Sequence, residues 1–222
     1  MRIAFFGGTF DPPHRGHLAI ARAAADRLRL DCVLFAPVGN QPLKHNLSVA
    51  GFDDRVAMVK LAIADDARFE LSLLDAPRRD QRPNYTIDTI HLLKDSLKQD
   101  AQIFCLVGAD SFLSLSRWHR AAELLFACDF IIAGRPGFDF GNAEKILPQR
   151  VRISGEPRHE DGLSTLGLRN DAGCFSTLYF LPNLREEVSA TEVRSALVKR
   201  LAEKDALPGP VAEYIRAHHL YE

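Results

Sequence analysis

The chain has 222 residues, of which 46% are hydrophobic and 26% are charged, and its formal net charge at pH 7 is −1. This length suits one domain with a substantial core, so we expect a single domain over residues 1–222. The near-neutral charge excludes bulk attraction to nucleic acid, so any anion-binding site must be local.

Targeting signals and metal-binding patterns are absent from the sequence. Met1 is followed directly by the apolar run 2–6, without the basic segment and longer apolar stretch of a secretory signal, and no apolar run approaches membrane-spanning length. The four cysteines are widely spaced and form no CxxC pair, which indicates reduced thiols and not a zinc site or disulfides. We therefore expect a cytoplasmic protein that binds neither membranes nor nucleic acid.

A glycine-rich turn follows the first predicted strand. It spans Gly7-Gly8-Thr9-Phe10-Asp11-Pro12-Pro13-His14-Arg15-Gly16-His17, and apolar residues then recur at helical spacing over residues 18–28. The turn joins a strand to a helix, whose first N–H groups and dipole favour an anion. His14 and His17 can donate hydrogen bonds to phosphate, and either gains positive charge if phosphate raises its pKa.

This turn, which we call the phosphate turn, matches neither a P-loop nor a GxGxxG dinucleotide fingerprint. Two alternatives to a phosphate site are a turn with incidental histidines and a two-histidine metal site. The strand before the turn and the helix after it favour the phosphate site over both.

Strand-then-helix units continue along the chain. We expect strands at residues 32–37, 69–74, 103–107, 130–133 and 178–181, and helices that begin near Phe52, Thr86, Asp110, Ser189 and Val211. Residues 142–147 suggest a short helix, and 155–173 a mobile loop excursion. The pattern predicts an α/β fold: a doubly wound, Rossmann-like parallel sheet with helices on both faces, and a small helical C-terminal portion at about 189–222.

Candidate ligand residues follow several of the predicted strands. Lys44 and His45 lie after the strand at 32–37, where a solvated loop lysine is the simpler interpretation, and Arg135 follows the strand at 130–133. Tyr85 and Thr86 open a helix whose first N–H groups are free for a ligand.

Two further positions allow a structural or a functional interpretation. Asp110 is either the N-cap of a helix or an acceptor for a nucleotide, and these roles are compatible. Trp118, between Arg117 and His119, is either a half-buried packing residue or a stacking platform for an aromatic ring.

A second phosphate-binding arrangement is predicted late in the chain. Ser189 and Glu192 have the spacing of a capping box, which starts a helix. Thr191 and Arg194 place a hydroxyl group and a cation near the same helix N-terminus. The two arrangements, one near each end of the sequence, suit a triphosphate held between them.

Together these motifs resemble the nicotinate-nucleotide adenylyltransferase family of the HxGH nucleotidyltransferases. The resemblance rests on the phosphate turn, Pro42-x-Lys44, Arg55, Tyr85-Thr86, Gly108-Ala109-Asp110 followed by Trp118, Arg135-Pro136-Gly137 and Ser189-Ala190-Thr191-x-x-Arg194. It implies adenylyl transfer from ATP to nicotinic acid mononucleotide, with deamido-NAD and pyrophosphate as products. Mg²⁺ is implied as a cofactor bound through the ATP phosphates, without protein ligands.

The resemblance also implies roles for individual residues. The implied ATP-binding residues are Gly7, Gly8, Thr9, Phe10, Gly16, Gly108, Asp110, Ser189, Thr191 and Arg194. The implied mononucleotide-binding residues are Lys44, Tyr85, Thr86, Trp118, His119 and Arg135. The implied catalytic residues, which would stabilise phosphate charge, are His14, His17, Lys44 and Arg194.

The sequence departs from the family pattern at two places. Leu43 stands where the family often has histidine, so either His45 substitutes or that contact is absent. The stretch 153–174 is longer than the usual connection, which leaves a homo-oligomer open. Alternative functions are adenylyl transfer to nicotinamide mononucleotide or phosphopantetheine, and a nucleotide sensor without turnover.

Overall fold

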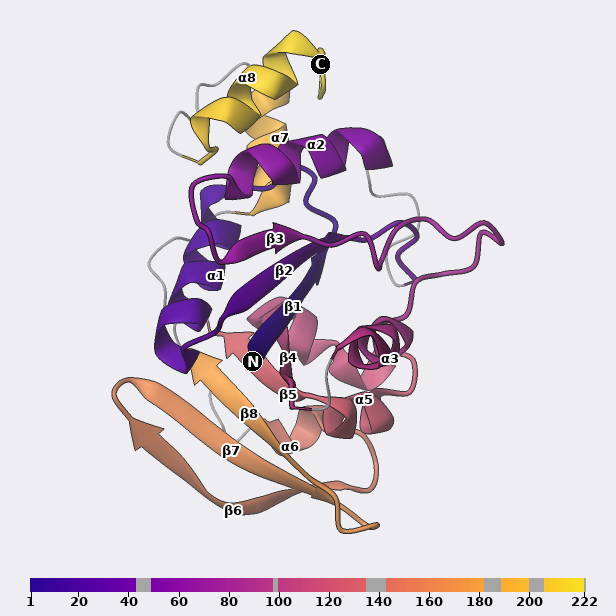
Figure 1. Ribbon diagram of the computed structural model, residues 1–222, viewed down its shortest axis with the longest axis vertical. Coiled ribbons are helices and arrows are strands. Elements are labelled where there is room, and N and C mark those ends of the chain that lie inside the picture. The colour runs from indigo at the N-terminus through magenta and orange to yellow at the C-terminus, as the bar shows by residue number, and fades with distance from the viewer. Residues whose placement is uncertain (43–48, 98–99, 135–142, 182–188, 200–205, 222) are drawn as a thin grey trace.

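The computed structural model describes residues 1–42, 49–97, 100–134, 143–181, 189–199 and 206–221. Its described strands form an eight-stranded sheet in the order β3-β2-β1-β4-β5-β8-β7-β6 (Figure 1). The strands are β1 (Arg2–Gly8), β2 (Cys32–Pro37), β3 (Phe69–Leu71), β4 (Gln102–Gly108), β5 (Asp129–Ala133), β6 (Val151–Glu160), β7 (Leu163–Asn170) and β8 (Phe175–Leu181). The helices are α1 (Arg15–Leu28), α2 (Phe52–Ile63), α3 (Thr86–Ser96), α4 (Ala109–Leu113), the 3-10 helix η1 (Leu115–Arg117), α5 (Ala121–Ala127), α6 (Ala143–Ile146), α7 (Ala190–Val198) and α8 (Gly209–Ala217).

The strands from β3 to β8 in this order are parallel, and β1, β2, β4 and β5 among them are buried on both faces. Side chains alternate across the sheet: in β4, Phe104 and Leu106 join one hydrophobic cluster, whereas Cys105 and Val107 join the other. Helices α1, α2, α7 and α8 contribute to the first cluster, and α3, α4, α5 and α6 to the second. The predicted α/β fold with helices on both faces is therefore confirmed, including the helices near the C-terminal end (Figure 1).

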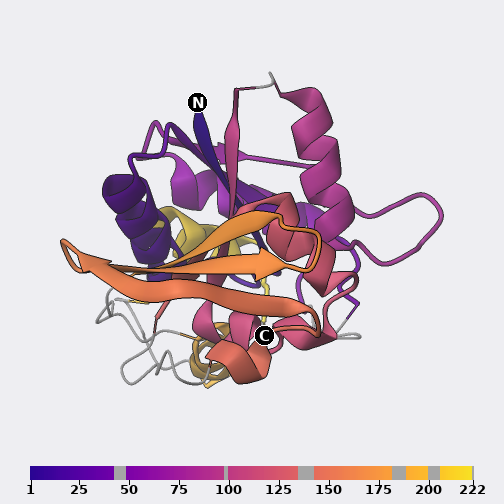
Figure 2. The same cartoon turned by 90° about the horizontal axis from the view of Figure 1, so that it is seen from below.

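The predicted loop excursion at 155–173 is wrong, because this stretch lies in two antiparallel strands. β6 pairs with β7, and β7 pairs with β8, so the hairpin extends the parallel sheet at one edge. Figure 2 shows the hairpin from below as the outermost part of the sheet. The short helix expected at 142–147 is present as α6.

The hairpin has a turn signal that the polar composition of β6 obscures. Asp161 and Gly162 connect the two strands with φ values of 49° and 75°. Two central residues with positive φ are the mark of a tight hairpin turn whose twist matches the strands, and Asp-Gly favours it. In β7, Leu166 and Leu168 alternate into the core, while β6 remains mostly exposed. The outer strand therefore lacks the apolar pattern that predicts a buried strand.

The sheet topology predicts where a ligand binds. The chain passes from β1 to β2 on one side, whereas β4 lies on the other side of β1. A crevice outside the carboxyl ends of β1 and β4 results, which is the usual ligand position in open α/β sheets. Among the helices that the structure describes, none has the length and apolarity needed to cross a membrane.

Candidate active site

The phosphate turn connects β1 to α1, with His14 as the helix N-cap. Phe10 adopts a left-handed φ of 49°, and its ring packs edge-on against Phe6 with the ring centroids 5.5 Å apart. A Cβ atom at Gly8 would lie 3.1 Å from the Phe10 ring. Glycine at this position allows the ring to fold beneath the turn. The Phe10 side chain is buried in the core, so only the backbone of Phe10 is available for the predicted contact with ATP.

The two histidines of the turn lie against each other. Their rings stack with centroids 3.6 Å apart and an interplanar angle of 29°. The backbone N–H of His14 donates to Nδ1 of His17 over 3.2 Å, and the buried Gly16 lies between them in the sequence. Because Nδ1 of His17 accepts this bond, the proton of a neutral His17 is on Nε2.

Burial determines the charge of this histidine pair. It lowers the pKa of His14 to about 4. The pKa of His17 lies well below its usual value because the ring is buried and faces His14. Both rings are therefore neutral at pH 7 without a ligand, and each can still donate one hydrogen bond to a phosphate oxygen. A bound anion would favour the charged form.

Thr9 and Arg55 connect the turn to the loop after β2. The buried guanidinium of Arg55 donates from Nη1 to the carbonyl oxygens of Thr9, at 2.7 Å, and Val38, at 3.0 Å. The Thr9 hydroxyl donates to Oε1 of Gln41 over 3.0 Å. These bonds fix the backbone of the turn relative to β2, and sequence reasoning assigned Arg55 no such role.

The predicted second phosphate-binding arrangement meets the first. Oγ of Ser189 accepts from the backbone N–H of Glu192, and the Glu192 carboxylate accepts from the N–H of Ser189, both at 3.2 Å, which confirms the capping box. Nη1 of Arg194 donates to the carbonyl oxygen of Asp11 over 2.6 Å, and Nη2 donates to the Thr191 hydroxyl over 3.4 Å. Residues 183 positions apart are thus in direct contact.

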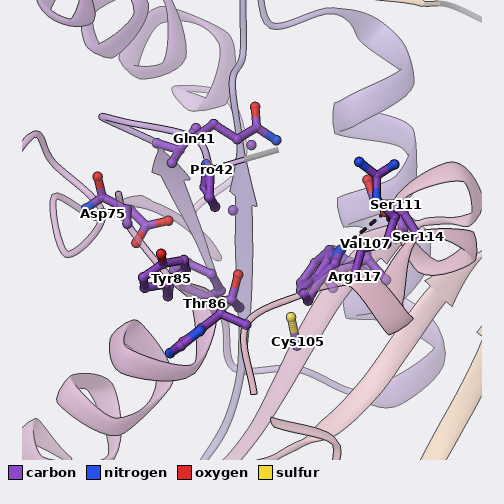
Figure 3. A pocket seen from close by; sticks show the side chains of 18 of the residues that line it. Gln41, Pro42, Asp75, Tyr85, Thr86, Cys105, Val107, Ser111, Ser114 and Arg117 are labelled. Atoms are coloured by element: carbon purple, nitrogen blue, oxygen red, sulfur yellow. Dashed lines mark hydrogen bonds between the residues drawn. The ribbon is translucent and has the colours of Figure 1, made fainter. Parts of the chain in front are cut away.

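A pocket of about 530 Å³ opens beside the turn (Figure 3). The predicted site residues that line it are Gly7, Gly8, Tyr85, Thr86, Asp110, Trp118 and His119. The other predicted residues that the structure describes lie in the phosphate turn, in α7 or its N-cap, and at Gly108. Gly108 is the N-cap of α4, so Asp110 is the second residue of that helix and not its cap.

Three aromatic rings line the pocket, those of Tyr85, Trp118 and His119. Trp118 is half-buried, and its indole N–H donates to Oγ of Ser114 over 3.2 Å, which holds the ring in place (Figure 3). The rings of Tyr85 and His119 stack with centroids 4.1 Å apart. Tyr85 is the N-cap of α3, so the N–H of Thr86 belongs to the first turn, where helices lack internal acceptors.

Sequence reasoning missed a buried carboxyl group in the pocket lining. Asp75 is 4% exposed, and burial raises its pKa. The Thr89 hydroxyl donates to Oδ1 of Asp75. Cys105 also lines the pocket, and a hydrogen bond with Cys128, together with burial, raises the pKa of its thiol well above the usual value. No local pattern in the sequence pairs Asp75 with Thr89, which lies 14 residues away.

Asn84 is a second lining residue that sequence reasoning missed. Its backbone N–H donates to the carbonyl of Asn40, and its Oδ1 accepts from the N–H of Asn40, both at 2.9 Å. Its Nδ2 donates to the carbonyl of Ala76 over 3.0 Å. The loop after β2 and the loop before α3 are therefore joined at the pocket. Arg117 and Ser111 also line the pocket, and their sequence context gave neither of them a ligand role.

A family model described as cytidylyltransferase-like matches residues 5–196. The chain belongs to the cytidylyltransferase-like family. A similar relative is the probable nicotinate-nucleotide adenylyltransferase of Gloeobacter violaceus, which is 39% identical over 224 residues that cover all of this chain and 96% of that protein. Another, of the same name from Solibacter usitatus, is 34% identical over 221 residues that cover both chains completely.

A similar fold is found in a solved structure of another protein. The nicotinic acid mononucleotide adenylyltransferase of Plasmodium falciparum, in complex with NaAD, aligns with a TM-score of 0.70. The alignment covers 99% of this chain and 97% of that one, at 17% sequence identity. This likeness supports the shared fold.

Some family positions lie outside the described residues. These are Lys44, Leu43 and His45 in the loop after β2, and Arg135 after β5. Within the described part of the chain, no group of three His, Cys, Asp or Glu side chains is arranged to hold a metal ion.

Proposed function

We propose that this chain transfers the adenylyl group of ATP to nicotinic acid mononucleotide, giving deamido-NAD and pyrophosphate in NAD biosynthesis. The names of the full-length relatives support this activity. The observation that carries the proposal is that one pocket is lined both by Gly7 and Gly8 of the phosphate turn and by Thr86 and Trp118. A triphosphate at the turn and a mononucleotide at α3 would meet there.

The reaction is a direct in-line displacement at phosphorus. A phosphate oxygen of the mononucleotide forms a bond to the α-phosphorus of ATP, the bond from that phosphorus to the bridging oxygen breaks, and pyrophosphate leaves with the electron pair. The attacking phosphate is already ionised at neutral pH, so it needs no general base. The protein contributes by positioning the reactants and by stabilising charge on the phosphates.

On the ATP side, the neutral imidazoles of His14 and His17 donate to phosphate oxygens, and Arg194 supplies a fixed positive charge beside the turn. The 2.6 Å bond from Arg194 to the carbonyl of Asp11 supports this placement. The remaining ATP contacts proposed are Gly7, Gly8, Thr9, the backbone of Phe10, Gly16, Gly108, Asp110, Ser189 and Thr191.

On the mononucleotide side, Trp118 stacks on the pyridine ring, and the backbone N–H groups of Thr86 and His119 donate to its carboxylate. The Tyr85 ring stacks on the His119 ring and so helps to hold the His119 segment in position. An amide in place of the carboxylate would point its own N–H₂ group at these donors, so the acid is preferred. Lys44 contacts the mononucleotide phosphate or the reacting phosphates, and Arg135 is a further phosphate contact.

Mg²⁺ bound to the ATP phosphates would supply additional neutralisation of phosphate charge. We also propose that residues 1–222 act as one domain, which the single eight-stranded sheet and the contact between Arg194 and Asp11 support. A cytoplasmic location is proposed from the names of the relatives, since they indicate an enzyme of NAD biosynthesis.

The test is pyrophosphate release with ATP and Mg²⁺, in parallel with nicotinic acid mononucleotide, nicotinamide mononucleotide and phosphopantetheine. We expect fast release with the acid only. Equal rates with acid and amide would retain adenylyl transfer and reject the carboxylate site. Pyrophosphate release with phosphopantetheine alone would identify phosphopantetheine as the substrate in place of nicotinic acid mononucleotide. Binding of ATP without release of pyrophosphate would indicate a nucleotide sensor.

A further inference from the structure

A buried hydrogen bond joins the phosphate turn to the C-terminal segment. The phenol of Tyr221 donates to Oδ1 of Asp11 over 2.6 Å, across 210 residues of sequence. Asp11 is 1% exposed and Tyr221 6% exposed, so water does not compete for this bond. Backbone N–H groups complete the contacts of the carboxylate: Val49 donates to Oδ2 at 2.7 Å, and Ala50 donates to Oδ1 at 3.1 Å.

The Tyr221 phenol keeps its proton at neutral pH. Burial and the bond to Asp11 raise the pKa of the Tyr221 phenol, so the phenol remains a donor. The guanidinium of Arg55 holds the carbonyl of Thr9, two residues before Asp11. A buried polar network whose members are hydrogen-bonded specifies one local geometry.

Asp11 is held from two directions. Tyr221 contacts its carboxylate, whereas Arg194 donates to its backbone carbonyl over 2.6 Å. Backbone conformations on both sides of the bond are unusual, because Phe10 and Tyr221 have φ values of 49° and 65°. Bulky residues rarely adopt this region, and surrounding contacts must hold them there.

We propose that Tyr221 is a positioning residue for ATP, which acts through Asp11 to keep the phosphate turn in its binding conformation. This inference rests on the proposed function. The Tyr221 side chain is buried and its phenol is bonded to Asp11, so its effect on the nucleotide passes through the turn. The residues proposed to contact the mononucleotide, Tyr85, Thr86 and Trp118, have no bond to Tyr221 among the described contacts.

The test compares Tyr221→Phe with Tyr214→Phe. Tyr214 lies in the neighbouring helix α8 and donates to the carboxylate of Asp54 over 3.0 Å, so each variant removes one phenol–carboxylate bond. Binding of ATP with Mg²⁺ is measured by calorimetry, KM for both substrates by pyrophosphate release, and the unfolding midpoint by heating.

For Tyr221→Phe we expect Kd and KM for ATP to rise about tenfold, the scale of one lost bond to a charged group, with KM for the mononucleotide within about twofold of wild type. Tyr214→Phe should leave both values unchanged. Asp11→Asn, which removes the negative charge, should give the same selective loss of ATP affinity and provides a second measurement if Tyr221→Phe folds poorly.

The two proposals fail differently. ATP affinity that is equal in wild type and Tyr221→Phe, or equal losses for both substrates, would overturn the positioning role alone. Failure of the wild-type protein to bind ATP would overturn the proposed function and the positioning role with it.

Discussion

The rings of Tyr85 and His119 stack with centroids 4.1 Å apart and an interplanar angle of 28°, which joins the N-cap of α3 to the segment after η1. The proposed carboxylate donors are the backbone N–H groups of Thr86, which follows Tyr85 directly, and of His119 itself. His119→Leu should raise KM for nicotinic acid mononucleotide by about fivefold, because the stacked pair is worth about 1 kcal/mol and holds these two segments together. Steady-state kinetics measure this change.

His218→Leu provides the matched control, since His218 stacks on Tyr214 with centroids 4.0 Å apart in α8. It should leave KM unchanged. Equal effects of the two leucine variants would argue against a specific role of the stack at Tyr85.

Thr86 allows the removal of a single backbone donor. It is the first residue of α3, where proline is well tolerated, and Tyr85 has the extended conformation that precedes proline readily. Thr86→Pro should reduce the preference for the acid over the amide mononucleotide by about tenfold, because one N–H donor is lost. Thr86→Ala keeps the N–H and should retain the preference. A proline variant with the wild-type ratio of kcat/KM values would remove Thr86 from carboxylate recognition.

His17 is expected to act mainly on turnover. His17→Ala should lower kcat by about 10²–10³, since it deletes one donor to the reacting phosphates, while the fold is retained. Circular dichroism checks the fold. His159→Ala, at an exposed position of β6, is the control for loss of an imidazole. Near-normal turnover of His17→Ala would exclude the ring from the mechanism.

The histidine pair makes stability dependent on pH. Because burial lowers the pKa of His14 to about 4, the unfolded chain binds more protons than the folded one below the usual histidine pKa of 6.5. This contribution is complete above pH 6.5 and is lost as the pH falls towards 4. When the pH falls from 7 to 5.5, protonation of His14 in the unfolded chain should by itself lower the unfolding free energy by about 1 kcal/mol.

Urea unfolding at several pH values measures this dependence. His14→Asn, which keeps a favourable N-cap residue without a titrating ring, should flatten it. A wild-type and an asparagine profile of equal slope would show that His14 is not buried in its neutral form.

Arg117 is the only guanidinium among the described residues that line the pocket. Both proposed substrates are anionic, so Arg117→Ala should raise KM for at least one of them about three- to tenfold, and more at low salt. Arg120→Ala is the control, because Arg120 is paired with Glu123 at 2.6 Å. Unchanged KM values at low salt would place Arg117 outside the binding site.

Local patterns were sufficient to predict much of the fold and of the site. The apolar runs at β1, β2, β4 and β5 are buried on both faces, so hydrophobicity alone marks them as strands. The capping box of Ser189 and Glu192 is a local feature with a local spacing, and its hydrogen bonds are present. The glycine turn before α1 was recognisable for the same reason.

Features that depend on tertiary contacts were not predictable in this way. Asp75 is an ordinary loop aspartate in the sequence, and only the fold brings it beside Thr89 at the pocket. The partnership of Asn84 with Asn40 links two loops separated by α2 and β3. β6 was missed because an outer strand exposed to water needs few apolar residues, although Asp161-Gly162 carried the signal for its turn.

The contacts of Asp11 with Arg194 and Tyr221, 183 and 210 residues away, also affect how the protein is made. During synthesis the glycine-rich motif emerges well before the segments that supply two of its holding contacts. Such distant pairing is slow to form, because long stretches of chain must first be ordered. The nascent polypeptide therefore carries the motif long before the nucleotide site is assembled. We expect it to bind ATP only once these distant segments have folded against the motif.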